Sequence, residues 1–252
     1  MDKTSPDFLS VLRAERRDLL NRFRQTRFES LIKNIDHTQV IPFATYSPWL
    51  SDETFCRAFE SIKANTLVDT YRCYELYRLA QQTGHVAGDI VEVGVWRGGT
   101  AALIAQASPE KVVHLFDTFT GVAKNDSARD TLYSGGEHAD TNEQIVKDLF
   151  SKVGRRCEIH RGIFPDDTLS RLPANVCFAH IDVDTYSSVK QSFGAIWPRV
   201  QRNGIVVFDD YGFFGCEGAT QAVNEIVVTH ANELFIHNLN GHALLVRQTE
   251  SN

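Results

Sequence analysis

The stretch Val176-Cys-Phe-Ala-His-Ile-Asp-Val-Asp184 joins an apolar, β-branched run directly to two aspartates, Asp182 and Asp184. A second stretch, Gly204-Ile-Val-Val-Phe-Asp-Asp210, repeats the arrangement and ends in Asp209 and Asp210. Apolar runs of this length are typical of buried strands in a parallel sheet. The carboxyl ends of such strands face one crevice, where ligands bind. The pattern therefore predicts an α/β sheet with four carboxylates gathered at one edge.

Four carboxylates in one place would repel one another and would lose hydration energy. Oxygen ligands suit a hard divalent cation such as Mg²⁺ or Ca²⁺, so the pattern favours a metal site. The alternative is that Asp184 caps the following helix while Asp209 or Asp210 begins a turn, because aspartate does both.

Composition narrows the class of protein. The chain has 252 residues, of which 42% are hydrophobic, and a net charge of −6, which argues against nucleic acid as a partner. The sequence contains no run of eighteen apolar residues, so no membrane span is expected. Arg13, Arg16 and Arg17 interrupt any apolar core of a signal peptide. Five cysteines without a CxxC motif are expected to be core residues of a cytoplasmic protein in a reducing compartment.

Strand-like and helix-like segments alternate from residue 89 onwards, which predicts a doubly wound, mostly parallel, Rossmann-like sheet. The expected strands are 89–93, 111–116, 157–160, 176–182 and 204–208, and the expected helices lie near 98–107, 141–152, 186–200 and 218–230. Asn240-Gly241 separates two further strand-like runs and is the strongest short signal for a hairpin. Seven strands with an antiparallel C-terminal hairpin are the arrangement of class I S-adenosylmethionine methyltransferases, as distinct from dehydrogenases.

The first 83 residues are predicted to form a helical extension, followed by a methyltransferase domain over 84–252. Apolar residues at helical spacing over 6–33 are interleaved with arginines, a pattern of helices that dock on a partner or lie on a membrane. We favour packing on the body or on another subunit, and so expect a homo-oligomer. Two further helices are expected at 52–63, with an N-cap at Ser51, and at 66–83.

The loop Glu92-Val-Gly-Val-Trp-Arg-Gly-Gly-Thr100 follows the first strand. Glycines in such a loop let the backbone approach a ligand and present a helix N-terminus. The spacing is not GxGxxG, and Trp96 and Arg97 would crowd two phosphates, so the loop suits a ligand with a carboxylate and an ammonium. Glu92 would attract the ammonium, and backbone amides near Gly98 and Gly99 would receive the carboxylate.

Three later positions extend this site. Asp117, at the end of the second strand, would accept hydrogen bonds from ribose hydroxyls, as in methyltransferases and NAD enzymes alike, or else begin a turn. Phe164 would line an adenine pocket or else pack in the core. The loop 121–141 is rich in Gly, Ser, Asp and Asn and is the candidate lid, in which Glu137 and His138 would touch substrate or remain solvated.

Together these motifs resemble the macrocin O-methyltransferase (TylF/MycF) family. The similarity rests on 89–100, 116–121, 135–140, 161–165, 180–186, 207–211 and 215–218, and it extends over about residues 41–247. It implies S-adenosylmethionine, Mg²⁺ and a small hydroxylated acceptor such as a sugar or glycoside. The lid sequence differs from that of the antibiotic-sugar members, which leaves the acceptor open.

The resemblance implies roles for the residues at matching positions of this sequence. Asp182, Asp209 and Asp210 would bind the metal, and Asp184 would be the general base, with His138 as the next candidate. The cofactor would be held by residues that follow the ends of several strands: Glu92, Gly94, Val95, Trp96, Arg97, Gly98, Gly99, Thr100, Asp117, Thr118, Phe119, Gly162, Phe164 and Asp182.

Three other functions share some of these sequence features. A catechol or phenol O-methyltransferase would use a metal ion in the same way, although the charged lid favours a polyhydroxylated acceptor. A nicotinamide-dependent oxidoreductase is disfavoured by the missing GxGxxG and by the terminal hairpin. A binding protein without activity would not need all four aspartates.

Overall fold

The structure is a computed structural model that describes residues 6–28, 35–42 and 44–249. The chain divides into two compact units, Met1–Tyr46 and Ser47–Asn252. The larger unit thus begins well before residue 84. It includes helices α2 (Glu53–Ile62) and α3 (Thr70–Thr83), because both bury apolar side chains in the same core as α4 (Gly99–Ala107). Among the described residues, no helix combines the length and apolar character needed to cross a membrane.

A seven-stranded sheet forms the centre of the larger unit, with the strand order β3-β2-β1-β4-β5-β7-β6. The strands are β1 (Asp89–Val93), β2 (Val113–Asp117), β3 (Glu158–Arg161), β4 (Val176–Ile181), β5 (Val200–Phe208), β6 (Leu234–His237) and β7 (Ala243–Val246). The first five pair in parallel, whereas β7 is antiparallel to both β5 and β6. The predicted parallel sheet with an antiparallel hairpin is confirmed.

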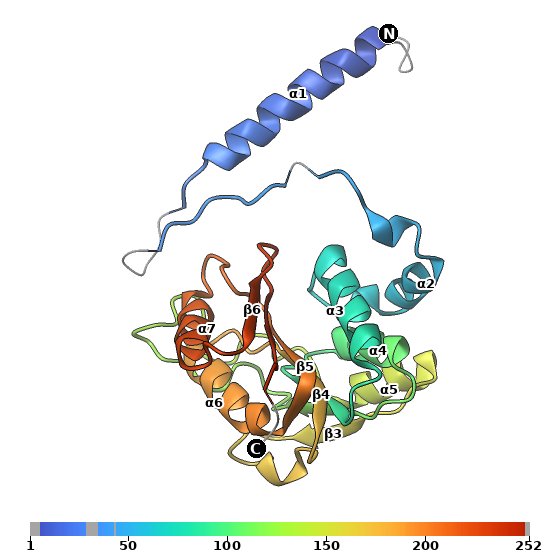
Figure 1. The fold of residues 1–252 in the computed structure, drawn as a ribbon, viewed down its shortest axis with the longest axis vertical. Helices are drawn as coiled ribbons and strands as arrows, with labels where there is room; N and C mark the ends of the chain where they lie inside the picture. Colours follow the sequence, from blue (N-terminus) through green and yellow to red (C-terminus); the bar gives the residue numbers. More distant parts are fainter. Residues whose placement is uncertain (1–5, 29–34, 43, 250–252) are drawn as a thin grey trace. The chain divides into compact units, whose positions relative to one another are not determined.

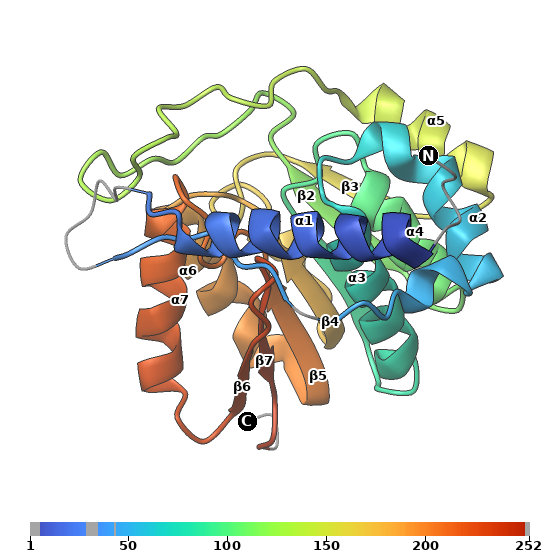
Figure 2. The same ribbon diagram turned by 90° about the horizontal axis from the view of Figure 1, so that it is seen from above.

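Helices cover both faces of this sheet (Figures 1 and 2). One layer contains α2, α3, α4 and α5 (Glu143–Val153), and the other contains α6 (Tyr186–Ile196) and α7 (Glu217–Thr229). Side chains alternate along β1, so that Ile90 packs in the first layer while Val91 and Val93 pack in the second. By the same alternation Glu92 points towards α3 and α4.

Several element ends differ from the prediction for local reasons. Helix α3 begins at Thr70 because the Asp69 side chain accepts the backbone N–H groups of Tyr71 and Arg72. The N-cap of α2 is Asp52, not Ser51, and it accepts from the N–H of Phe55. After α6, a short 3₁₀ turn with a proline replaces the expected last helical turn, and β5 begins at Val200.

The smaller unit consists of one helix and an extended segment. Helix α1 (Pro6–Gln25) ends earlier than predicted, since Phe28 already pairs with His37 in an antiparallel bridge. The rest of the predicted helix, 29–33, lies outside the described residues. Four apolar side chains of α1 are between 43% and 54% exposed: Val11, Leu12, Leu19 and Phe23.

Deletion of residues 1–36 is predicted to shift the protein towards monomer. An exposed apolar stripe on one helix is a normal feature of an interface, and the deletion leaves Ser47–Asn252 intact. Light scattering on the full-length and truncated chains measures the effect. A full-length protein that is itself monomeric would contradict the prediction.

Candidate active site

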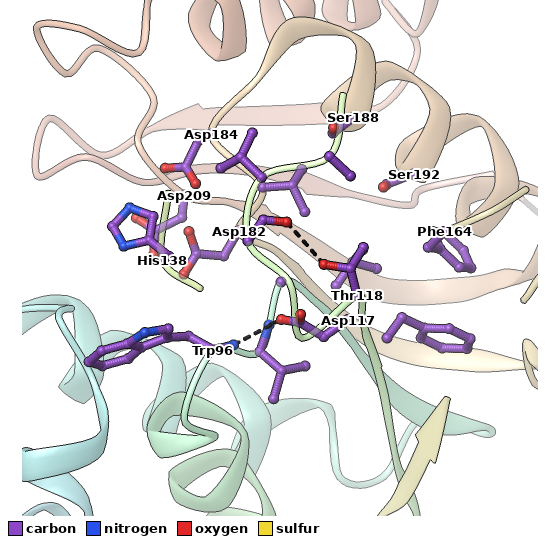
Figure 3. A pocket seen from close by; sticks show the side chains of 18 of the residues that line it. Trp96, Asp117, Thr118, His138, Phe164, Asp182, Asp184, Ser188, Ser192 and Asp209 are labelled. Atoms are coloured by element: carbon purple, nitrogen blue, oxygen red, sulfur yellow. Dashed lines mark hydrogen bonds between the residues drawn. The ribbon is translucent and has the colours of Figure 1, made fainter. Parts of the chain in front are cut away.

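A cavity of about 330 Å³ lies where β1, β2, β4 and β5 end. Its wall contains Asp182, Asp184, Asp209 and Asp210, as expected from the two sequence stretches, together with Asp117. Figure 3 shows Asp182, Asp184 and Asp209 close together, with Asp117 beside the Trp96 loop. The sheet thus brings together carboxylates that are far apart in the sequence.

The structure separates the predicted cofactor residues into two groups. The cavity is lined by Gly94, Val95, Trp96, Thr100, Asp117, Thr118, Gly162, Phe164 and Asp182, and also by His138. It is not lined by Glu92, Arg97, Gly98, Gly99 or Phe119. Sequence reasoning missed several lining residues, notably 65–68, Arg72, Tyr133, Ser188 and Ser192.

Gly94 brings the first loop against the end of β4. Its φ is +84°, and a Cβ at this position would lie 1.6 Å from the backbone oxygen of Asp182, so only glycine fits. Asp117 then organises the loop. One of its carboxylate oxygens accepts the N–H groups of Val95 (2.6 Å) and Trp96 (2.9 Å), and the other accepts the N–H of Phe119 (2.6 Å).

The surroundings of Glu92 and Gly98 bear on two predicted contacts to the cofactor. Glu92 is fully buried, where its Oε1 accepts the Thr100 hydroxyl at 2.6 Å and lies 2.8 Å from Nδ1 of His180. Its side chain does not line the cavity. The N–H of Gly98 donates to the carbonyl of Val95 at 2.8 Å, so this amide is already used within the loop, and the predicted contact of a carboxylate with the Gly99 amide stays a prediction.

Unusual backbone conformations are concentrated at this site. Five residues other than glycine have φ between 47° and 61° here: Trp96, Phe119, His138, Asp184 and Asp210. Such conformations cost free energy and persist where the surrounding structure enforces them, often at functional sites. The positions of Asp184 and Asp210 are thus fixed by the fold.

The aspartates disfavour one another's charge. Burial and then the charge of Asp209 raise the pKa of Asp182 well above its usual value, and the same two causes raise the pKa of Asp210. Ligand atoms of Asp184, Asp210 and Cys216 lie within 4.8 Å of one another. A cation among these carboxylates would relieve the repulsion.

Asp209 differs from the other aspartates because basic side chains surround it. Burial acts to raise its pKa, but the positive charges and hydrogen bonds of His242, His180 and Arg72 hold it well below its usual value. Its Oδ2 lies 3.2 Å from Nε2 of His180 and 3.4 Å from Nε2 of His242, while its Oδ1 pairs with the Arg72 guanidinium.

These contacts belong to a buried polar chain that crosses the sheet. From Asp209 it runs through His180 to Glu92 on β1. In the other direction it runs through His242 to Glu75 on α3, whose Oε2 lies 2.6 Å from Nδ1 of the histidine. Burial lowers the pKa of His180, but hydrogen bonds to Asp209 and Glu92 raise it to about 10.

The predicted lid, residues 121–141, is held near its middle and near its C-terminal end. Asp140 accepts the indole N–H of Trp96 at 2.8 Å and a guanidinium N–H of Arg97 at 2.6 Å. Towards α7, Thr131 donates to Glu217 at 2.8 Å, and Figure 2 shows the loop between β2 and α5 reaching this helix. Glu137 does not line the cavity. Instead hydrogen bonds from Ser134 and its neighbours hold it in place and lower its pKa to about 2.

Known proteins resemble the chain in sequence. The family model of the macrocin O-methyltransferases (TylF) matches residues 60–237. The 8-demethyl-8-(2,3-dimethoxy-alpha-L-rhamnosyl)-tetracenomycin-C 4'-O-methyltransferase of Streptomyces olivaceus is 31% identical over 149 residues, which are 53% of this chain and 57% of that protein. The mycinamicin III 3''-O-methyltransferase of Micromonospora griseorubida is 26% identical over 174 residues, 62% and 68% of the two chains.

Solved structures show the same fold. The O-methyltransferase NovP superposes with a TM-score of 0.65 at 23% identity, covering 73% of this chain and 83% of its own. The calicheamicin methyltransferase CalS11 superposes with a TM-score of 0.59 at 21% identity, covering 84% and 98%. The fold is that of class I methyltransferases. Because the family model matches well over half of its length, this chain belongs to the macrocin O-methyltransferase family.

Proposed function

We propose that the protein transfers a methyl group from S-adenosylmethionine to a hydroxyl of a sugar or a glycosylated natural product, with the help of Mg²⁺. The observation that carries the proposal is the cavity that holds four aspartates from β4 and β5 at one end and the Asp117 loop at the other. One end has the donor set of a hard cation, and the other has the strand-end acid typical of ribose binding.

The aspartates fit a bound Mg²⁺. Asp182, Asp209 and Asp210 would hold the ion, since all three line the cavity. Burial, and then the charge of Asp209, raise the pKa of Asp182 and Asp210, and a cation would offset both causes. The ion would stabilise negative charge that develops on an acceptor hydroxyl. Arg72 would share Asp209 with it, and His180 and His242 would keep that carboxylate ionised and oriented.

The opposite end fits a nucleoside. Oγ of Ser192 is buried, lines the cavity and has no hydrogen-bond partner among the described residues. Figure 3 shows Ser192 and Phe164 at the same end of the cavity, so an aromatic ring and an unused hydroxyl would meet a purine there. Among structures of similar fold, TomG is in complex with S-adenosylmethionine and a Bacillus cereus O-methyltransferase with S-adenosylhomocysteine.

Asp184 is proposed to remove the proton of the acceptor hydroxyl. It lines the cavity beside Asp210, and its left-handed backbone fixes its direction. The lid, through Asp140 on Trp96 and Arg97, would exclude water from the reaction. Holding the acceptor oxygen about 3 Å from the methyl group would supply much of the rate.

The names of similar proteins support the proposed acceptor class. One is named for a rhamnosyl tetracenomycin, and a second CalS11 structure is described as a TDP-rhamnose methyltransferase. The proposal is tested by a methyl-transfer screen over nucleotide sugars, free sugars, glycosides and catechols, with and without Mg²⁺. Turnover of sugars or glycosides only with Mg²⁺ supports it, turnover of catechols alone supports the alternative acceptor, and NADH binding without methyl transfer overturns it.

Asp117→Ala is predicted to weaken the binding of S-adenosylhomocysteine at least tenfold. The change removes a charged acceptor of ribose hydrogen bonds and releases the N–H groups of Val95 and Trp96 from their present partner. Calorimetry measures the affinity, and Asp140→Ala at the lid is a milder comparison because its ion pair is exposed. Unchanged affinity of the Asp117 variant would remove this residue from the cofactor site.

A further inference from the structure

A second group of potential metal ligands lies at the β2–β3 edge of the sheet, and none of its members lines the cavity. It consists of His114 on β2 and of Glu158 and His160 on β3. The strands pair in register, with His114 opposite Glu158 and Phe116 opposite His160. Because positions two apart on a strand share a face, all three side chains are directed to the same side of the sheet.

The three ligand atoms have the spacing of a coordination sphere. Nδ1 of His114 lies 3.2 Å from Nε2 of His160 and 3.5 Å from Oε2 of Glu158, and the remaining separation is 4.0 Å. In the plane of the three atoms, the point equidistant from them lies about 2.1 Å from each. This distance is close to the bond length of about 2.0–2.2 Å for zinc with imidazole and carboxylate ligands.

The surroundings also suit metal-binding histidines. Nε2 of His114 is buried without a hydrogen bond, and its nearest acidic neighbour is Asp89, whose Oδ2 lies 3.5 Å away. A ligating histidine usually directs its second nitrogen towards a carboxylate in this way.

We propose that His114, Glu158 and His160 form a binding site for a borderline transition-metal ion, with Zn²⁺ as the favoured occupant. Two imidazoles and one carboxylate suit zinc and disfavour Mg²⁺, which prefers oxygen ligands. The site is independent of the proposed methyl transfer. It would clamp the edge strand β3 to β2 and brace the cavity wall, because Gly162 and Phe164 follow His160 closely and Phe116 packs on both His160 and Phe164.

The test is a Zn²⁺ titration of the full chain in excess Mg²⁺, in competition with a chromophoric chelator. One tight site is expected, with affinity at least tenfold lower in Glu158→Gln and no tight site in His160→Gln. Glu158 has a side chain that is 59% exposed, so its replacement leaves the fold intact. His85→Gln, which removes an exposed histidine elsewhere, and Asp210→Asn should both retain the site.

X-ray absorption at the zinc edge provides a second readout, in which two imidazole nitrogens at about 2.0–2.1 Å are expected. Zinc should also raise the Tm of the wild type and of His85→Gln, and should raise that of Glu158→Gln by less. Zinc binding that disappears only in Asp210→Asn would place the ion among the aspartates and overturn the proposal. The absence of tight binding in the wild type would show that His114 and His160 are simply a hydrogen-bonded pair.

Discussion

Asp184→Asn is expected to lower kcat by about 10²–10⁴-fold, the usual contribution of a general base, while leaving the affinity for S-adenosylhomocysteine nearly unchanged. The substitution keeps the shape of the side chain, and asparagine tolerates the left-handed backbone (φ 60°) of this position. Steady-state kinetics and calorimetry on the same preparation separate the two effects.

Metal dependence distinguishes a base from a ligand at position 184. Asp184 lies close to Asp210, so the structure allows either role. If Asp184 is the base, added Mg²⁺ leaves the variant inactive, whereas loss of a ligand is partly rescued by excess metal. Full rescue by Mg²⁺, or near-normal turnover of the variant without added Mg²⁺, would show that another residue is the base. His138 would be the next residue to test, since it also lines the cavity.

Asp209→Ala is expected to destabilise the protein by about 3–5 kcal/mol, the usual consequence of leaving a buried charge without its partner. Asp209 pairs with Arg72 and His180 and lies 3.4 Å from Nε2 of His242, and its side chain is only 1% exposed. Without it, the buried Arg72 guanidinium would lose its ion pair with Asp209. His180 and His242 would lose a neighbour that raises the pKa of both. Urea unfolding in the absence of Mg²⁺ measures the change.

Asp210→Asn is the matched control and should behave in the opposite way. Burial and the neighbouring aspartates raise the pKa of Asp210, so its ionised form disfavours the folded state at neutral pH. Replacing it by asparagine should leave the metal-free protein as stable as the wild type or more so, while Mg²⁺ affinity and activity both fall. Equal losses of stability in the two variants would show that Asp209 has no special role in the buried polar chain.

The sequence was sufficient to predict the sheet and the cluster of carboxylates at one end of the cavity. Strand-length apolar runs, Asn240-Gly241 and the aspartates that follow two of the strands are local signals, and each one fixes a structural feature independently of the rest of the chain. Gly94 is also a local signal, because a glycine directly after a strand indicates that another part of the backbone comes close. Here that neighbour is the backbone of Asp182.

The partners of Asp209 could not be predicted in this way. Arg72 lies 137 residues away on α3, and His242 belongs to the final hairpin. In the sequence each one is a single basic residue in a helix or beside a turn. Only the packing of α3 and β7 against the end of β5 brings them to one carboxylate. The alternation of side chains along β1 directs Glu92 away from the cavity, where it forms one end of the polar chain.

The buried polar chain also favours one register of the last strand in the sheet. Strand β7 pairs in reverse direction beside β5, with Ala243 opposite Phe208, and β-strands of apolar residues tolerate slippage unless something penalises it. A slip of one residue would turn His242 to the other face and separate it from both Glu75 and Asp209. Misregistered chains would therefore bury unpaired charge, so the hairpin that closes the sheet can settle stably only where it also completes the active site.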